Sequence, residues 1–283
     1  MVPELPEVEI TARRLDGALR GATIESAIAP GINALKSFAP PLAALEGLEI
    51  DGVGRRGKQI IVEVGGELAL LMHLMSAGRL QLFETRAGPR DRTSRLLVRI
   101  ADGRELRLRE FGTKQAAWVK LLELAGLGAE ESLTRLGPEA WPQPPADLAE
   151  RLGEPRPLHT ALRDQHVIAG IGRSWVDEIL WHAKLSPFKR GSDLDEREVS
   201  ELSAAIASTL DDAIEHYERV IELPIPDKLP MPLLVHRHEG EPCPRCGTRL
   251  EAVNYEDYVM SYCPNCQTEG RVLKDRRLSR LLK

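Results

Sequence analysis

The chain has 283 residues, of which 42% are hydrophobic and 29% charged, a composition typical of a globular protein with two domains. No apolar run approaches the roughly 18 residues of a membrane span, and the acidic N-terminal segment differs from the basic start of a signal peptide, so we expect a cytoplasmic protein. The net charge of -5 argues against a uniformly basic nucleic-acid binder, so a nucleic-acid partner would need a local basic surface.

The first predicted element is a helix that follows Pro3 and Glu4 and ends near Arg20. A proline with acidic neighbours suits the first helical turn. Apolar residues then recur at helical spacing, at Val8, Ala12, Leu15 and Leu19.

The same opening residues also offer chemistry. A proline that is the first residue of a mature chain carries a secondary amine, which can attack an electrophilic carbon. Glu4 would lie beside it as a proton donor or acceptor. A proline inside a chain has only an amide nitrogen, so nucleophilic chemistry at Pro3 requires that the residues before it be absent.

Short alternating or apolar runs fill the chain up to about residue 125 and predict strands of a β-sandwich or barrel. These runs are 59–64, 67–73, 79–83, 95–100, 105–109 and 115–121. Beyond them the periodicity becomes helical over 147–152, 174–182 and 195–217. The proline-rich segment 223–232 predicts an irregular connection.

All four cysteines form two C-x-x-C pairs near the end of the chain: Cys243 with Cys246, and Cys263 with Cys266. This spacing predicts four thiolates around one structural Zn²⁺ in a zinc ribbon, with a β-hairpin between the pairs. Two disulfides are the competing interpretation, which the expected cytoplasmic location disfavours. Loss of the metal should unfold so small a module.

The segment 164–180 contains the string Ile168-Ala169-Gly170-Ile171-Gly172-Arg173, followed by a predicted helix. Glycines before a helix let backbone N–H groups approach a phosphate, and the helix dipole adds attraction. A helix start with flexible glycines is the simpler alternative.

These motifs together resemble the formamidopyrimidine-DNA glycosylase and endonuclease VIII family. The resemblance covers nearly the whole chain, from Pro3-Glu4 to the cysteine pairs, and includes the strings 55–58, 73–80, 109–112 and 164–180. It implies an α+β multidomain fold: an N-terminal β-sandwich with a leading helix over 1–124, a helix-two-turn-helix domain over 125–235, and a zinc ribbon over 236–270. A basic tail, 271–283, follows.

The resemblance implies a monomeric base excision repair enzyme that acts on damaged duplex DNA and combines DNA glycosylase activity with abasic-site lyase activity by β/δ-elimination. Such an enzyme extrudes the damaged nucleotide from the duplex. The implied catalytic residues are Pro3 as the nucleophile, Glu4 as a proton shuttle and Lys58 as a contact to DNA and the damaged nucleotide. Glu7 is either a supporting carboxylate or a solvated residue of the helix start.

The DNA-binding residues implied by the resemblance serve three purposes. Met75 and Phe111 would fill the gap left by the extruded base, and Arg109 would face the orphaned base. Backbone phosphates would be bound by Lys58 and by Gly172, Arg173 and Tyr258.

Val2 is the first departure from the family pattern, because it separates Met1 from Pro3. Translation that starts at codon 2 would let methionine removal expose Pro3. Alternatively, the Val2 amine serves from about 3.8 Å away, which predicts a poor enzyme. In the third case neither residue is removed, and the protein binds damaged DNA without Schiff-base chemistry.

The other departures affect DNA contacts. Tyr258 stands where the family has a phosphate-binding arginine, and Arg173 stands where it has asparagine. The wedge methionine, Met75, is shifted by one position, and 223–232 lacks the family's glycine-serine string. The basic tail is either a solvated terminal helix or a replacement for the lost arginine. A zinc-ribbon interaction protein is a third, more distant function class.

Overall fold

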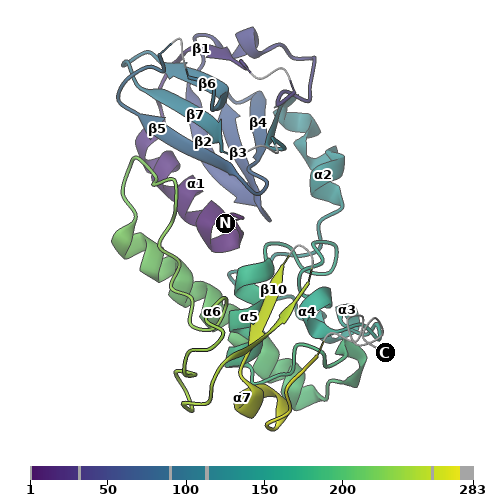
Figure 1. The fold of residues 1–283 in the computed structure, drawn as a ribbon. Helices are drawn as coiled ribbons and strands as arrows, with labels where there is room; N and C mark the ends of the chain where they lie inside the picture. The colour runs from purple at the N-terminus through teal and green to yellow at the C-terminus, as the bar shows by residue number, and fades with distance from the viewer. Residues whose placement is uncertain (1, 31–32, 89–90, 112–114, 256–257, 275–283) are drawn as a thin grey trace. The chain divides into compact units, whose positions relative to one another are not determined.

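The computed structural model describes residues 2–30, 33–88, 91–111, 115–255 and 258–274, and the chain folds as two units (Figure 1). Unit 1 comprises Met1–Arg135 and Ile214–Pro230, and unit 2 comprises Leu136–Ala213 and Met231–Lys283. The long helix α6 (Glu196–Val220) supplies residues to both.

Unit 1 is a β-sandwich preceded by helix α1 (Leu5–Leu19), as predicted. Both sheets are antiparallel and four-stranded, and α1 packs with them in one apolar core, in which Val8, Leu15 and Leu19 are fully buried. The first sheet has the order β1 (Ile24–Ile28), β6 (Ser94–Ile100), β7 (Glu105–Glu110), β5 (Gly78–Phe83); the second has β2 (Ile50–Arg56), β3 (Gln59–Val64), β4 (Leu68–His73), β8 (Trp118–Glu123).

Short helical segments complete unit 1. They are η1 (Leu42–Leu45), η2 (Leu124–Ala129) and α2 (Glu131–Thr134).

Unit 2 is mainly helical and ends in the predicted hairpin. Its elements are α3 (Leu148–Arg151), α4 (Leu158–Ala161), α5 (Arg173–His182), η3 (Gly191–Asp193), the first part of α6, the antiparallel strands β9 (Glu251–Asn254) and β10 (Val259–Tyr262), and α7 (Pro264–Thr268). The segment 221–250 contains no helix or strand, which confirms the irregular connection expected over 223–232. Among the described residues, no helix has the length and apolar character needed to cross a membrane.

Two strands were absent from the sequence prediction, and their residues explain why. β1 has an irregular burial pattern, with Ile24 and Ala27 buried three positions apart, so the period of two is lost. β2 contains Gly52 and Gly54, and glycine is depleted in strands. Pairing with neighbouring strands, rather than local propensity, holds both in place.

Candidate functional site

Pro3, Glu4 and Glu7 are buried at the start of α1. The Glu7 carboxylate caps the helix, because its Oε2 accepts the backbone N–H of Glu4 at 2.9 Å. Its Oε1 accepts the hydroxyl of Tyr217, from α6, at 2.6 Å. Only 3% of Glu7 is exposed, so the alternative of a solvated glutamate is wrong.

Tyr217 is the residue of α6 that fixes this carboxylate. It is fully buried, and burial together with the negative charge of Glu7 raises the pKa of Tyr217 above its usual value. The phenol therefore stays protonated and acts as a donor to Glu7. The carboxylate beside Pro3-Glu4 is thus held from two directions.

Lys58 lies in the tight turn between β2 and β3. Arg56 pairs with Gln59 across the hairpin, which leaves Gly57 and Lys58 as the turn residues. Gly57 has a φ of +56°, a conformation that glycine adopts without steric cost. The turn places Lys58 at the tip of the hairpin, and its side chain is half-buried.

His73 ends β4 and lies within electrostatic reach of Lys58. Burial and the positive charge of Lys58 lower the pKa of His73 to about 4. The neutral ring accepts the backbone N–H of Met75 at Nδ1, at 2.9 Å, so its proton resides on Nε2. A neutral imidazole thereby fixes the first residues of the loop after β4.

Met75 has a φ of +50°, the left-handed conformation that costs a non-glycine residue roughly 1–2 kcal/mol. Glycine adopts this conformation without steric cost, so the loop has a glycine-type backbone at a methionine. Gly78 is needed nearby, because a Cβ there would lie 2.4 Å from the carbonyl oxygen of Leu74. Ser76, which follows Met75, is exposed.

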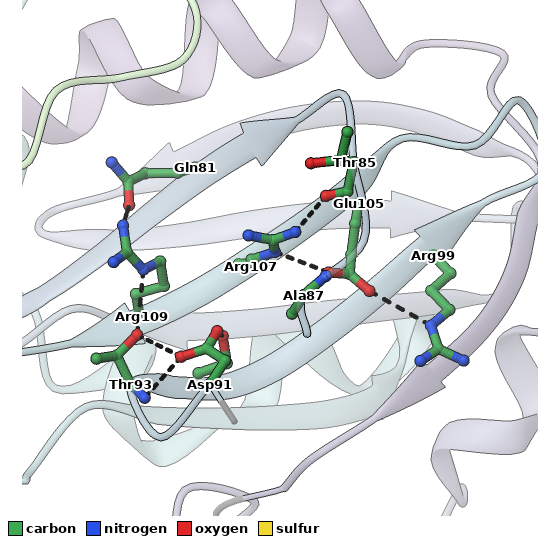
Figure 2. Close-up of polar contacts among 10 residues, drawn as sticks. Gln81, Thr85, Ala87, Asp91, Thr93, Arg99, Glu105, Arg107 and Arg109 are labelled. Carbon is green, nitrogen blue, oxygen red and sulfur yellow. Dashed lines mark hydrogen bonds and ion pairs between the residues drawn. The ribbon is translucent and has the colours of Figure 1, made fainter. Parts of the chain in front are cut away.

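Arg109 and Phe111 lie beside this loop. The backbone N–H of Phe111 donates to the carbonyl of Ala77 at 3.3 Å, which joins the two predicted wedge segments. The guanidinium carbon of Arg109 lies 4.7 Å from the centroid of the Phe111 ring. Arg109 also donates to Gln81 at 3.1 Å and to the hydroxyl of Thr93 at 3.2 Å (Figure 2).

A second cluster on the same sheet orders the neighbouring arginines. Glu105 is fully buried and accepts from Arg107 at 2.7 Å and from Arg99 at 3.3 Å (Figure 2). Arg107 in turn lies 4.2 Å above the ring of Phe83. Arg99 and Arg107 are thus held by one buried carboxylate, separately from Arg109, which bonds Gln81 and Thr93.

Asp227, in the proline-rich connection, binds to this arginine surface. Its carboxylate lies 3.3 Å from Arg109 Nη1 and 3.0 Å from Gln81 Nε2, and its carbonyl accepts from Arg79 at 2.7 Å. The connection that replaces the family's glycine-serine string therefore runs against β5 and β7 and supplies a negative charge to Arg109.

In unit 2 the turn before α5 is organised by Gln165. Its Oε1 accepts the N–H of Gly170 at 2.9 Å, and its Nε2 donates to the carbonyl of Ile171 at 2.8 Å. Gly170 has a φ of +106°, and Gly172 is the N-terminal cap residue of α5. Arg173 is the first residue of the helix. The simpler alternative of a flexible glycine segment does not fit a turn so bonded.

Two acidic residues of α5 hold the zinc ribbon. Glu178 is 2% exposed, and its carboxylate accepts three successive backbone N–H groups, those of residues 234–236, at 2.8–3.1 Å. Burial raises the pKa of Glu178, whereas these hydrogen bonds oppose that rise. Asp177 accepts the N–H of Ser261 at 2.8 Å and His236 Nδ1–H at 2.7 Å.

The four cysteines meet as the spacing predicts. All four Sγ atoms lie within 4.8 Å of one another, with separations such as 3.5 Å between Cys246 and Cys263 and 3.9 Å between Cys243 and Cys266. Tetrahedral binding of zinc at about 2.3 Å requires separations of about 3.8 Å, whereas a disulfide requires about 2.05 Å. The donor set fits one structural Zn²⁺.

Tyr258 directly precedes strand β10 in the hairpin. It is half-buried, and its ring stacks on the ring of Tyr255. Its neighbours Glu256 and Asp257 lie outside the described residues, as does most of the basic tail, 275–283. The expectation that this tail supplies the missing positive charge therefore stays a prediction.

Comparison with known proteins agrees with this architecture. The family model of the formamidopyrimidine-DNA glycosylase N-terminal domain matches residues 2–113, that of the glycosylase H2TH domain matches 136–224, and that of a zinc finger found in FPG and IleRS matches 240–268. The formamidopyrimidine-DNA glycosylase of Chloroflexus aurantiacus is 32% identical, over 94% of this chain and 98% of its own length.

Two further relatives are informative. A Lactococcus lactis Fpg, solved in complex with DNA that contains an abasic site, superposes with a TM-score of 0.82 at 27% identity and covers 94% of this chain and 99% of its own. An uncharacterized formamidopyrimidine-DNA glycosylase-like protein of Mycobacterium tuberculosis is 42% identical over 52% of this chain and 94% of its own length. The chain belongs to the formamidopyrimidine-DNA glycosylase family, a family of DNA glycosylases, and it contains that family's zinc finger.

The residues that support the site were missed by sequence reasoning, and they share one property. They belong to no local motif, and Tyr217, Asp227 and His236 are distant in sequence from the residues that they contact. His159, the fourth, lies 3.2 Å from Asp177 of α5. A polar residue outside the motifs can be recognised as a supporting residue only once it is known to be buried, and the sequence does not show burial.

Proposed function

We propose that this protein is a bifunctional DNA glycosylase and abasic-site lyase that removes oxidised bases from duplex DNA. The observation that carries the proposal is the arrangement at the start of α1. Pro3 and Glu4 are buried there beside the carboxylate of Glu7, which accepts two hydrogen bonds. Membership of the family supports it, as do the relatives solved with abasic or damaged DNA.

In the proposed reaction the amine of Pro3, as the first residue of the mature chain, attacks C1′ of the damaged nucleotide. The glycosidic bond breaks, the base leaves with its electron pair, and a proton reaches it through Glu4. The nitrogen then loses its proton and expels O4′ from C1′, which takes up a proton as the sugar ring opens and leaves an iminium at C1′. The iminium makes the 2′ proton acidic, and its removal breaks the C3′–O bond, with the 3′ phosphate as the leaving group. The DNA strand is thereby cut without hydrolysis of a phosphate.

The other residues of the proposal bind DNA. Lys58, at the tip of its hairpin, contacts phosphate near the damaged nucleotide, and Arg173 and Gly172 bind phosphate at the start of α5. Phe111 and the loop that contains Met75 fill the gap left by the extruded nucleotide. The zinc ion would be held by the four cysteines and supplies no chemistry beyond structural support.

The test compares two forms of the protein, one that begins at Pro3 and one that begins at Met1, with both termini verified by intact mass. Each is incubated with duplex DNA that contains an abasic site, and the Schiff base is trapped with borohydride. We expect a covalent adduct from the Pro3 form, formed at least about a hundredfold faster than from the longer form, since misplacement by 1 Å alone can cost that much.

Absence of an adduct from the Pro3 form would contradict the lyase assignment, and equal rates would show that Met1 and Val2 do not matter.

Release of an oxidised base should slow in Glu4→Gln of the Pro3 form, because the proton donor is lost. The second candidate function, DNA binding without Schiff-base chemistry, is favoured by Val2 and Tyr258. It predicts equal affinity of both forms for abasic-site DNA, no adduct from the form that begins at Met1, and retention of Met1 and Val2 in protein purified from its own host.

Asp227→Asn should strengthen DNA binding, because the Asp227 carboxylate forms an ion pair with Arg109 and repels the phosphates of DNA. We expect the dissociation constant to fall about two- to fivefold, the equivalent of one exposed ion pair. The measurement is fluorescence anisotropy of a labelled duplex. Asp102→Asn is the matched control, since Asp102 pairs with Arg104 on the same unit. Equal gains in both variants would indicate a general charge effect and contradict a specific role for Asp227.

A further inference from the structure

Tyr258 is the centre of a stack of rings in unit 2. The ring of Tyr255 lies parallel to it, at 4.3 Å between centroids and an interplanar angle of 9°. The ring of His159, from α4, lies 5.7 Å away at 12°. Such offset stacking fixes the plane of a ring. Tyr258 is therefore a rigid part of this surface.

Two arginines from separate segments converge on this ring. The guanidinium carbon of Arg163, in the turn after α4, lies 4.4 Å from the Tyr258 centroid, and that of Arg173, at the start of α5, lies 5.1 Å from it. The two carbons can be no farther apart than the sum of these distances. Both positive charges are thus held beside one ring, and together they attract an anion more strongly than either does alone.

Two acidic side chains of the described segments near Arg163, Asp164 and Asp177, are bonded to other groups. Asp164 accepts from Arg156 at 2.8 Å and from the N–H of His166 at 3.0 Å. Asp177 is fully buried between His236 and His159. Among the ion pairs between described residues, none involves Arg163. These two carboxylates are therefore bonded to groups other than Arg163.

His159 positions Arg163. Its Nδ1 lies 3.4 Å from Arg163 Nη1, and because an arginine N–H can only donate, Nδ1 must accept. The ring proton is then on Nε2, which lies 3.2 Å from Asp177 Oδ1. One buried imidazole therefore orients the guanidinium of Arg163 and also stacks on the ring that this guanidinium covers.

We propose that Arg163 and Arg173 together bind a backbone phosphodiester of DNA, with the ring of Tyr258 as the platform that orders both guanidinium groups. This inference rests on the proposed function for its ligand. The site compensates for the missing arginine at position 258 with charge from two other segments. Because a phosphodiester is common to all nucleotides, the contact adds affinity without sequence preference.

The experiment measures the affinity of the full chain for a duplex, with and without an abasic site, between 50 and 200 mM salt. For Arg163→Gln we expect about tenfold weaker binding to both duplexes at physiological salt, the loss of one charge-assisted contact. The slope of log affinity against log salt should fall in magnitude by about 1. Arg197→Gln is the control, because Arg197 is an exposed residue of unit 2 that pairs with Glu201.

Three further variants sharpen the result, each with its zinc content and circular dichroism verified. Arg163→Lys should restore the salt slope, since it restores the charge. Tyr258→Phe should bind DNA more tightly than Tyr258→Leu, since the ring that orders both guanidinium groups remains. Tyr258→Leu should lose about as much affinity as Arg163→Gln.

The proposal is overturned if Arg163→Gln has the same slope as Arg197→Gln, or if Arg163→Lys does not restore it. A loss in Tyr258→Phe equal to that in Arg163→Gln would make the hydroxyl, not the platform, the phosphate contact. These titrations use protein that begins at Met1 and need no chemistry, so a failed borohydride experiment does not affect them. If the unchanged protein binds no duplex, both this site and the proposed function are wrong.

Discussion

Cys263→Ser should release the zinc ion and abolish measurable DNA binding. A structural site of four thiolates supplies roughly 10–16 kcal/mol of apparent binding energy at neutral pH, and in small modules that energy is folding energy. The ribbon between the cysteine pairs consists of one short hairpin, which has too small an apolar cluster to persist without the metal. Zinc per chain is measured by elemental analysis, and DNA affinity by anisotropy.

Reconstitution provides the control for this prediction. The unchanged protein, stripped with a chelator, should regain zinc and DNA affinity when the metal is returned, whereas Cys263→Ser should regain neither. A variant that keeps one zinc per chain, or binds DNA as well as the unchanged protein, would refute the role of the ribbon.

Asp177→Asn should destabilise unit 2 by about 3–5 kcal/mol, the cost of removing a buried carboxylate whose hydrogen-bond donors are then left without their acceptor. Asp177 is fully buried, and its Oδ2 alone accepts both the His236 ring and the N–H of Ser261. An asparagine amide has one acceptor oxygen, and its NH₂ group would face a ring N–H. The measurement is the free energy of unfolding in urea.

Asp147→Asn is the matched control, because Asp147 is exposed and pairs only with Arg151 one helical turn away. We expect little change from it. Similar stability of Asp177→Asn and Asp147→Asn would show that the buried contacts of Asp177 contribute no net stability.

Much of the fold could be predicted because its elements carry strong local patterns. The run at 59–64 is rich in β-branched residues, which favour strands, and β3 has the same bounds. The helix predicted over 174–182 begins one residue earlier, at Arg173. β8 begins at Trp118, three residues after the predicted start, because the segment before it is fixed by Glu110, which accepts the N–H groups of Ala116 and Ala117.

Of the candidate site, only the residues that belong to sequence motifs could be predicted from the sequence. The cysteine pairs specify a zinc site by spacing alone, and the structure brings the four sulfur atoms together. The left-handed backbone at Met75 is hidden in the sequence, since methionine rarely adopts it. The surroundings of Tyr258 are hidden as well, because Arg163 lies 95 residues before it in the chain numbering and belongs to no motif. Tertiary packing decides such contacts.

The attachment of the ribbon to α5 has a consequence for metal exchange. Glu178 holds the chain just before the first cysteine pair, and the indole N–H of Trp181 lies 3.3 Å from Cys243 Sγ. Arg245, between the first two cysteines, donates to the carbonyl of Trp181 at 2.9 Å. These contacts tether the first cysteine pair to α5. When the ion departs and the hairpin unfolds, we expect this pair to stay near α5, so that rebinding of zinc has to refold only the ribbon.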